Sequence, residues 1–529
     1  MIKLLVSMGA ILMLGALGFL LLRNKPEPRT YTVPEGARPG DLTALEPCDY
    51  KPNKKNTFRA ECGTLTVPEN WDDPASRRIA LPVYRIPATH PGPAEPVFVL
   101  LGGPGASNLL FTPREWLFEN RDVVLVGYRG VDGSVDLVCP QVSQASARQF
   151  GKNFLSEAAT AELAQAVGQC AADFQAAGVD LRGYTVQGVV ADMEAARQAL
   201  GYERVNLWSE SYGTRVAQLY AYLHPESLNR VLMIGVNTPG HFVYDPAALD
   251  GMLQHISKLC AQDPECSRRT GDLAQAIGDL NHDMPKRWLI FPIDPGTIRT
   301  LTQMMFFSTS TMPLVVDAYL SAANGDPSGL ALLNLMGPFM FSFDTFHMGD
   351  FLNKGGTLDL EYYHGPESVQ LGSSRMGAPL AEWVWPMAVA WPLELVEADL
   401  RHLQESNVDM LAVNGTLDFS TPPVALDELQ PYYNHAQTVL LPEFSHVDDV
   451  ENLQPQAIER LVTRYYDTGV ADASLFTYQP LSFKPGMSPA RMAKALVAGM
   501  VLFPPLLIAV VVILWRRKRA RGRAEKGIQ

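Results

Sequence analysis

The chain has 529 residues, of which 47% are apolar and 19% charged, and its net charge is −13 at pH 7. This length exceeds what one compact hydrophobic core usually needs, so we expect a second domain or a large insertion. The basic C-terminal residues 516–529 carry +6, which leaves −19 on residues 1–515 and makes that body unsuited to binding nucleic acid.

Two apolar stretches lie near the ends of the chain. Leu4–Leu22 is long enough to cross a bilayer, so residues 1–25 are predicted to be a membrane anchor or signal segment. An uncleaved anchor is favoured, because no short apolar core with a cleavage site is evident. Residues 495–515 are predicted to form a transmembrane helix, and the basic tail 516–529 is typical of the cytoplasmic side. We therefore expect membrane lipid around both terminal segments of a cell (inner) membrane protein, with the body on its periplasmic or extracellular side.

The numbers and spacing of cysteine and histidine bear on whether the protein binds a metal or uses a catalytic thiol. The six cysteines are scattered, with no Cys-x-x-Cys pair, which favours structural disulfides in an oxidising compartment over a zinc site or a catalytic thiol. Six cysteines allow fifteen pairings, and spacing alone does not choose among them. The ten histidines show neither His-Glu-x-x-His nor His-x-His spacing, so we expect no metal site and no other cofactor.

Residues 46–239 alternate between strand and helix patterns. Continuous apolar runs such as Pro96–Leu101 are typical of strands buried on both faces, and helical periodicity lies between them. This alternation predicts a mostly parallel sheet with helices on both faces and with active loops at the strand ends. The expected strands are 64–67, 79–86, 96–101, 122–126, 204–208 and 230–236, and the expected helices are 158–176, 189–200 and 214–224.

The pattern changes over residues 240–400, where strand runs give way to helical stretches rich in aromatic residues and methionine. Strand patterns return at Met410–Val413 and Thr438–Leu441. The helical block is therefore predicted to be a cap inserted into one fold, over the strand ends, where it would form a wall of the substrate pocket. The expected division is core residues 46–239 and 401–470, the cap between them, and a linker over 471–494.

The run Val205–Trp208 breaks into Ser-Glu-Ser-Tyr-Gly and then resumes as a helical pattern. A strand, a sharp turn and a helix in this order form a nucleophile elbow, in which the central serine, Ser211, stands at a strained tip with its hydroxyl exposed. The residues two positions away must be small because the backbone folds back on itself, and Ser209 and Gly213 meet this demand. Any turn of small residues could show the same short motif, so the assignment depends on partners elsewhere.

Such partners follow the two returning strands. Asp418 comes after the first and His446 after the second, so the chain order Ser, Asp, His is that of α/β-hydrolases. His446 would take the proton of Ser211, and Asp418 would hold the imidazole tautomer and stabilise its cation. Alone, His446 would be an ordinary loop histidine and Asp418 a turn residue, but their joint placement predicts a catalytic triad.

Five further sequence features belong together: Gly-Gly-Pro-Gly at 102–105, Tyr-Arg-Gly-Val-Asp-Gly-Ser at 128–134, Ser-Tyr-Gly-Thr at 211–214, Gly-Thr-Leu-Asp-x-x-Thr-Pro at 415–422 and the late His446. With these motifs the chain resembles one family of α/β-hydrolases, the prolyl and tripeptidyl aminopeptidases (proline iminopeptidase-like). The resemblance covers about residues 48–467 and implies an oxyanion hole made by the backbone N–H groups of Gly103 and Tyr212. It also implies the local disulfides Cys48–Cys62, Cys139–Cys170 and Cys260–Cys266.

The chain departs from the family pattern at three positions. Leu101 stands where a histidine is usual, Gly127 where an aspartate is usual, and Ser209 where the elbow usually has a glycine. None of the three is a triad member, so the departures bear on the preference for substrate and not on the predicted chemistry.

Triad and resemblance together predict a membrane-anchored, exported serine aminopeptidase that releases N-terminal residues or short peptides through an acyl-enzyme. The ammonium of its substrate needs an anionic partner, because burying an unpaired cation is costly. Glu210, beside Ser211, is one candidate, and Asp344 and Glu382 in the cap are others; each could instead be an ordinary surface acid.

Other readings of the same residues stay open. The string Glu-Ser-Tyr-Gly also occurs in serine carboxypeptidases, where the acid serves the opposite terminus of the peptide, and an esterase or lipase would use the same triad. A hydrolase-like binding module would be expected to have lost a triad residue, whereas this chain keeps all three. The expected partner is therefore a peptide or small ester substrate, with the oligomeric state left open.

Overall fold

The computed structural model describes residues 31–90, 92, 94–149, 152–340, 346–501, 512, 513 and 515. Of the predicted terminal segments, residues 1–25 and the tail 516–529 lie outside the described residues, and most of 495–515 does too. Among the helices that are described, none combines the length and the apolar character needed to cross a membrane.

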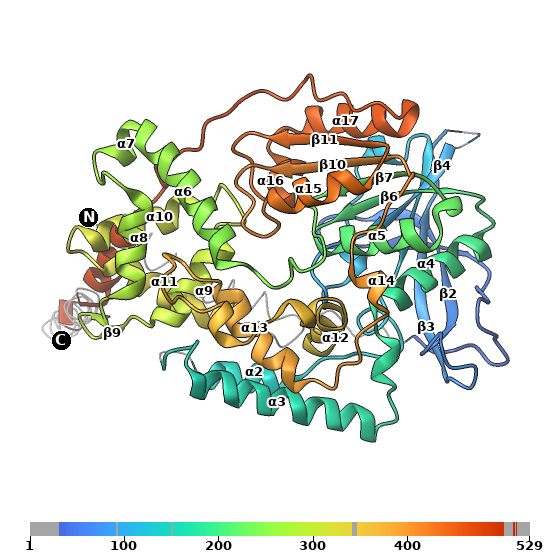
Figure 1. Ribbon diagram of the computed structural model, residues 1–529, viewed down its shortest axis with the longest axis horizontal. Helices are drawn as coiled ribbons and strands as arrows, with labels where there is room; N and C mark the ends of the chain where they lie inside the picture. Colours follow the sequence, from blue (N-terminus) through green and yellow to red (C-terminus); the bar gives the residue numbers. More distant parts are fainter. Residues whose placement is uncertain are drawn as a thin grey trace, which may run out of the picture.

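The described strands form a nine-stranded sheet in the order β1-β2-β3-β5-β4-β6-β7-β10-β11 (Figure 1). The first three strands are antiparallel to their neighbours, and the strands from β5 to β11 run parallel. The mostly parallel sheet predicted from the alternation is therefore confirmed. The strands are β1 Glu46–Tyr50, β2 Phe58–Pro68, β3 Arg78–Ile86, β4 Ala94–Leu100, β5 Arg121–Val126, β6 Val205–Glu210, β7 Leu228–Ile234, β10 Met410–Gly415 and β11 Ala436–Leu441.

Helices cover both faces of the sheet, as the buried strand β5 illustrates. Successive side chains of a strand point to opposite faces. Val124 and Val126 belong to a core shared with helices α4 (Val186–Leu200) and α5 (Tyr212–Leu223). Val123 and Leu125 belong to a second core shared with α17 (Pro455–Thr468). A strand buried on both faces needs the unbroken apolar run that the sequence shows.

A helical layer lies between β7 and β10 in the sequence and beside the sheet in space (Figure 1). It also contains a short hairpin, which the sequence analysis missed because each of its strands has only two residues, β8 (Arg287–Trp288) and β9 (Phe291–Pro292). The main helices are α6 Pro246–Gln262, α8 Leu273–His282, α9 Pro295–Met305, α10 Met312–Ala323, α11 Ser328–Met340, α12 Met348–Asp359 and α13 Pro379–Ala390.

Helix α3 (Glu157–Ala176) packs differently from the expectation. The alternating pattern predicts that this helix covers the sheet, but it packs against α13 and shares the core of the helical layer through Leu163 and Val167. Just before it, the Phe154 ring stacks on Trp383 with ring centroids 5.9 Å apart. Periodicity shows that a helix has an apolar face but not which surface covers that face.

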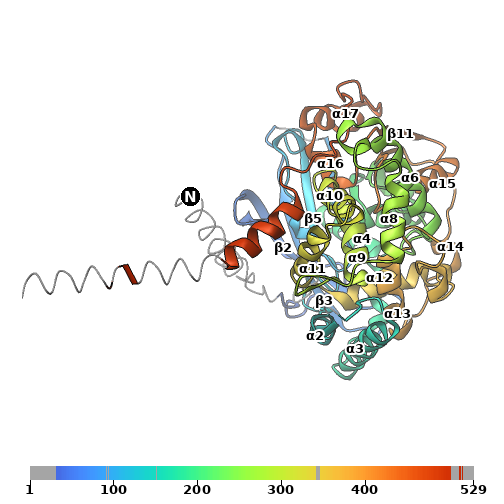
Figure 2. The same ribbon diagram turned by 90° about the vertical axis from the view of Figure 1, so that its left-hand side faces the viewer.

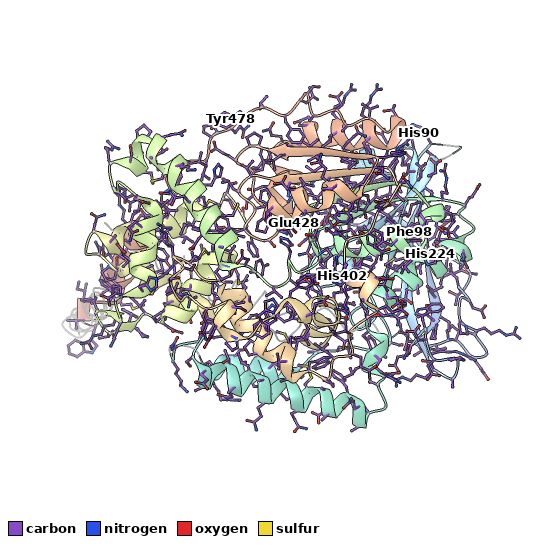
Figure 3. All side chains as sticks on the ribbon, viewed as in Figure 1. His90, Phe98, His224, His402, Glu428 and Tyr478 are labelled. Atoms are coloured by element: carbon purple, nitrogen blue, oxygen red, sulfur yellow. A yellow bond between two sulfur atoms is a disulfide. The ribbon has the colours of Figure 1, made fainter. Side chains whose placement is uncertain are left out.

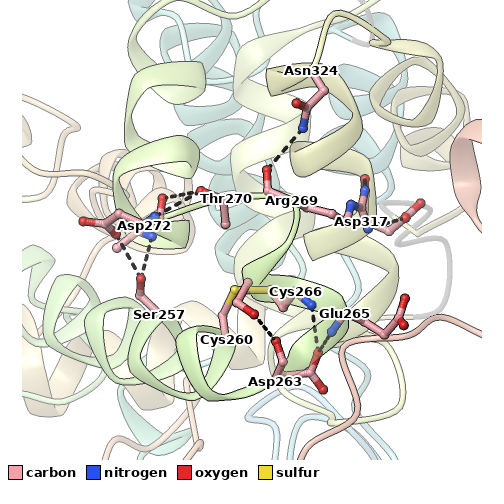
Figure 4. Close-up of a disulfide and its surroundings, with 12 residues drawn as sticks. Ser257, Cys260, Asp263, Glu265, Cys266, Arg269, Thr270, Asp272, Asp317 and Asn324 are labelled. Carbon is pink, nitrogen blue, oxygen red and sulfur yellow. Dashed lines mark hydrogen bonds and ion pairs between the residues drawn. A yellow bond between two sulfur atoms is a disulfide. The ribbon is translucent and has the colours of Figure 1, made fainter.

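The six cysteines form the pairs that the family resemblance implied, and none is free. Cys48–Cys62 joins the neighbouring strands β1 and β2, and Cys139–Cys170 ties the start of α2 (Pro140–Gln149) to α3. Cys260–Cys266 joins the end of α6 to the short helix α7 (Pro264–Ser267), where the Asp263 carboxylate caps α7 by accepting from two backbone N–H groups (Figure 4).

After α17 the chain runs back from the sheet to the helical layer (Figure 1). The hydroxyl of Tyr478, labelled in Figure 3, donates to Glu443, which lies between β11 and His446. Further along, the Ser488 hydroxyl donates to Asp317 of α10 at 2.6 Å. The predicted linker, residues 471–494, is thus hydrogen-bonded to both the sheet part and the helical layer.

Candidate active site

Ser211 stands at the turn between β6 and α5, with φ 50° and ψ −119°. A serine rarely adopts this conformation, and it is held here because the Ser211 N–H donates to the Ile234 carbonyl at 2.8 Å. The small neighbours are also required: a Cβ at Gly213 would lie 1.9 Å from the Leu100 carbonyl oxygen, and the buried Ser209 hydroxyl donates to the Leu232 carbonyl at 2.6 Å. The geometry is that of the predicted nucleophile elbow.

Asp418 and His446 lie side by side although 28 positions separate them, because the parallel strands β10 and β11 end at the same edge. Nδ1 of His446 is 2.7 Å from Oδ2 of Asp418. The Asp418 carboxylate is fully buried and also accepts from the N–H groups of Ser420 and Thr421 and from the Thr421 hydroxyl, each at 2.8 Å. These donors satisfy an ionised carboxylate and hold it against the ring.

The His446 ring also lies beside the elbow. A Cβ at Gly235 would be 2.8 Å from Cε1 of His446, and Gly235 directly follows Ile234, whose carbonyl holds the Ser211 N–H. Among the described residues the Ser211 hydroxyl and His446 make no hydrogen bond; in active sites without substrate this bond is commonly long and tightens on binding. The three predicted triad residues are therefore brought to one place.

The predicted oxyanion donors flank the same serine. Tyr212 is the first residue of α5, where backbone N–H groups have no partner within the helix. The Gly102–Gly105 loop follows β4, the neighbour of β6, and a Cβ at Gly102 would lie 2.7 Å from Cβ of Ser211. Gly103 itself has φ 72°, a backbone conformation that glycine adopts without strain.

A buried ion pair supports this loop and was missed by the sequence analysis. The Asp350 carboxylate of α12 accepts from the Gly105 N–H at 3.0 Å and lies 2.8 Å from the ammonium of Lys354. Lys354 also donates to the Arg129 carbonyl at 3.1 Å, and neither charged side chain is exposed to solvent. Burial raises the pKa of Asp350, while Lys354 acts in the opposite direction. The only signal in the sequence was an acid four residues before a lysine in a helical stretch.

The motif at 128–134 supplies a buried arginine that joins several parts of the fold. The guanidinium of Arg129 is fully buried, donates twice to Asp192 and contacts the carbonyls of Glu69 and Gly183 at 2.7 and 2.6 Å. A buried charge needs such complete pairing. Arg129 thereby fastens the loop after β5 to α4 and to the loop before β3.

Glu210 lies close to another acid. Its Oε1 accepts from the Trp208 indole N–H at 2.6 Å, and the carboxyl group of Glu451 in α16 (Val447–Asn452) acts on it electrostatically. Burial, and then the Glu451 carboxyl, raises the pKa of Glu210 well above its usual range. The guanidinium of Arg114 lies 3.4 Å from Glu451. Glu210 is thus favoured in its neutral form, which the sequence could not indicate.

We expect Glu210→Gln to stabilise the protein increasingly as pH rises above about 4.5, the ordinary pKa of a glutamate. Below that pH both folded and unfolded chains hold the proton, so Glu210 has no effect on the pH dependence. Above it the unfolded chain releases a proton that the folded chain retains, so the parent loses stability with pH. Urea unfolding at pH 5 and pH 8 measures this, and an equal effect of the substitution at both would contradict the raised pKa.

Of the two candidate acids in the cap, the structure describes one, Glu382. Glu382 lies at 2.8 Å from Arg299, and both side chains are mostly buried, so its charge is already compensated. The pairing of Glu382 with a substrate ammonium stays a prediction, and it would have to compete with Arg299. Asp344 lies outside the described residues.

This sheet order, elbow and acid–histidine pair define an α/β-hydrolase fold, and residues 96–255 match the family model for the alpha/beta hydrolase fold. The predicted resemblance is confirmed by relatives: a tripeptidyl aminopeptidase of Streptomyces lividans is 27% identical over 244 residues, which is 43% of this chain and 45% of the relative. Serine protease Hip1 of Mycobacterium tuberculosis is 28% identical over 237 residues, which is 38% of this chain and 40% of the relative.

These alignments span less than half the length of the curated relatives. Among solved structures, a thermophilic esterase from Thermogutta terrifontis is 12% identical, covers 76% of this chain and 98% of its own, and has a TM-score of 0.36.

Proposed function

We propose that the protein is an exported, membrane-anchored serine hydrolase that acts as an aminopeptidase. The observation that carries the proposal is the placement of Ser211, at a strained elbow, beside the buried Asp418–His446 pair. The relatives named as a tripeptidyl aminopeptidase and a serine protease support a peptide substrate.

In the proposed reaction, Oγ of Ser211 attacks the scissile carbonyl while Nε2 of His446 accepts its proton. Asp418 stabilises the imidazolium through the 2.7 Å contact with Nδ1. The N–H groups of Gly103 and Tyr212 stabilise the oxyanion, and His446 then protonates the leaving amine. Water releases the acyl group by the same steps, which restores the Ser211 hydroxyl.

A second candidate, a serine carboxypeptidase, is favoured by one observation. The guanidinium of Arg114 lies 3.4 Å from Glu451, and burial raises the pKa of the neighbouring Glu210, so the site offers a cation and a hydrogen-bond donor, which suit a substrate carboxylate better than an ammonium. For an aminopeptidase, the same pair would have to supply its remaining negative charge to the substrate amine.

A peptide panel separates the candidates. We expect peptides with a free N-terminus to be cleaved and their acetylated forms to be poor substrates, because an acetyl cap removes the ammonium. Losing one charge-assisted hydrogen bond costs about 1.5 to 3 kcal/mol, or on the order of ten- to a hundredfold in kcat/KM. Release of products is followed by mass spectrometry. Equal cleavage of both forms contradicts aminopeptidase activity, and cleavage that requires a free C-terminus selects the carboxypeptidase.

Export has its own test. If both ends of the chain are cytoplasmic, a reporter active only in the cytoplasm should work when fused after Gln529 and fail when fused near Ser488. The apolar stretches, the basic tail and six paired cysteines support this arrangement. The reverse reporter pattern would remove the case for an exported body.

A further inference from the structure

The β8–β9 hairpin presents two large apolar side chains to solvent. Leu289 is 59% exposed and Ile290 86% exposed, at the tip of a turn in which Leu289 has φ 52°. Beneath them, the Trp288 and Phe291 rings stack with centroids 6.0 Å apart. Two large apolar side chains next to each other in water are unfavourable, so a partner that covers the tip would stabilise it.

Helix α11 extends this apolar surface. The Asp294 N–H, just after β9, donates to the side-chain carbonyl of Asn334 at 2.9 Å, which places α11 against the hairpin. The next two residues of the helix, Leu335 and Met336, are 50% and 41% exposed. We refer to Leu289, Ile290, Leu335 and Met336 as the tip patch.

The other end of α11 contacts the helix formed by residues 489–501. The Ser328 hydroxyl donates to the Ala490 carbonyl at 3.3 Å, and the Lys494 ammonium lies 2.6 Å from Asp326. The hairpin, α11 and the red helix 489–501 lie together at the end of the protein farthest from the sheet (Figure 1), and Figure 2 faces this end. The sequence after this helix stays apolar to Trp515 and then turns basic.

The charges next to the tip patch indicate what kind of surface could bind it. Lys286 and Arg287 are exposed and directly precede the apolar turn, on a chain that is otherwise strongly acidic. Basic side chains beside inserted apolar ones are the composition that binds an anionic bilayer surface.

We propose that the tip patch is a lipid-docking surface, which inserts Leu289 and Ile290 into an anionic bilayer at the end of the protein that also carries the helix 489–501. This contact belongs to the folded body and is separate from the terminal segments. It rests on the membrane location in the proposed function and does not depend on catalysis. Docking there would hold the body in one orientation on the membrane.

A single-cysteine probe tests the proposal in the full chain. Because the native cysteines are all paired, Ile290→Cys introduces a lone thiol that can carry an environment-sensitive nitrobenzoxadiazole label. The matched control is Val470→Cys, at a position that is 52% exposed and follows α17 on the sheet side. Circular dichroism of both variants checks the fold.

With the full chain reconstituted in phosphatidylcholine–phosphatidylglycerol vesicles, we expect the label at 290 to shift to shorter emission wavelengths and to be quenched severalfold less by iodide than the label at 470. In vesicles of pure phosphatidylcholine, the label at 290 should be less protected from iodide quenching. Equal quenching at both positions overturns the proposal, since the terminal segments would then be the sole lipid contacts. Protection at 290 without vesicles, accompanied by cross-linking between chains through the introduced thiol, also overturns it and assigns the patch to a second copy.

Discussion

Ser211→Ala and His446→Ala are each expected to abolish turnover and labelling by a fluorophosphonate while leaving the protein folded. The Ser211 side chain supplies the nucleophile, and without His446 its hydroxyl has no base to take the proton. Removal of one triad member commonly leaves only about 10³- to 10⁴-fold acceleration over water, from the oxyanion hole and substrate binding. Hydrolysis of the best peptide or ester substrate and gel detection of the label measure the loss.

Surface residues of the same types are the controls. Ser474→Ala changes an exposed serine of the C-terminal segment, and His435→Ala changes a histidine that is 59% exposed. Both variants should keep full labelling and turnover. If the Ser211 variant still reacts with the fluorophosphonate, the nucleophile lies elsewhere and the proposed mechanism fails.

Asp350→Ala is expected to lower the free energy of unfolding by about 3 to 5 kcal/mol, since it leaves the fully buried Lys354 ammonium without its counter-charge. It also removes the acceptor of the Gly105 N–H, so the loop that carries Gly103 loses its support. Urea unfolding measures the first effect. We expect kcat to fall more than KM changes, because the loop is proposed to act in the transition state.

The double variant Asp350→Ala with Lys354→Met separates the two effects. Removing both charges should recover much of the stability, because an apolar pair avoids the cost of burying a lone ion. The loop would still lack its acceptor, so kcat should remain low in a stable protein. Recovery of kcat together with stability would show that Asp350 serves folding and not the position of the loop.

The sequence alone was sufficient for the features that depend on local pattern. The unbroken apolar run of β5 predicted a strand buried on both faces, and small residues around Ser211 predicted a tight elbow. Asp418 and His446 could be related from their positions in the chain, because each follows a strand and parallel strands end at one edge of the sheet.

The tertiary structure alone decided which distant side chains compensate each other. Glu210 and Glu382 are candidate partners for a substrate ammonium in the sequence, but only the structure shows that Glu451 acts on the pKa of Glu210 and that Arg299 lies 2.8 Å from Glu382. The pairing of the Gly105 N–H with Asp350 joins residues 245 positions apart. Periodicity and motif spacing describe what a segment can do by itself, whereas the ionisation of a buried acid and the partner of a helix depend on the atoms that packing brings within a few ångströms.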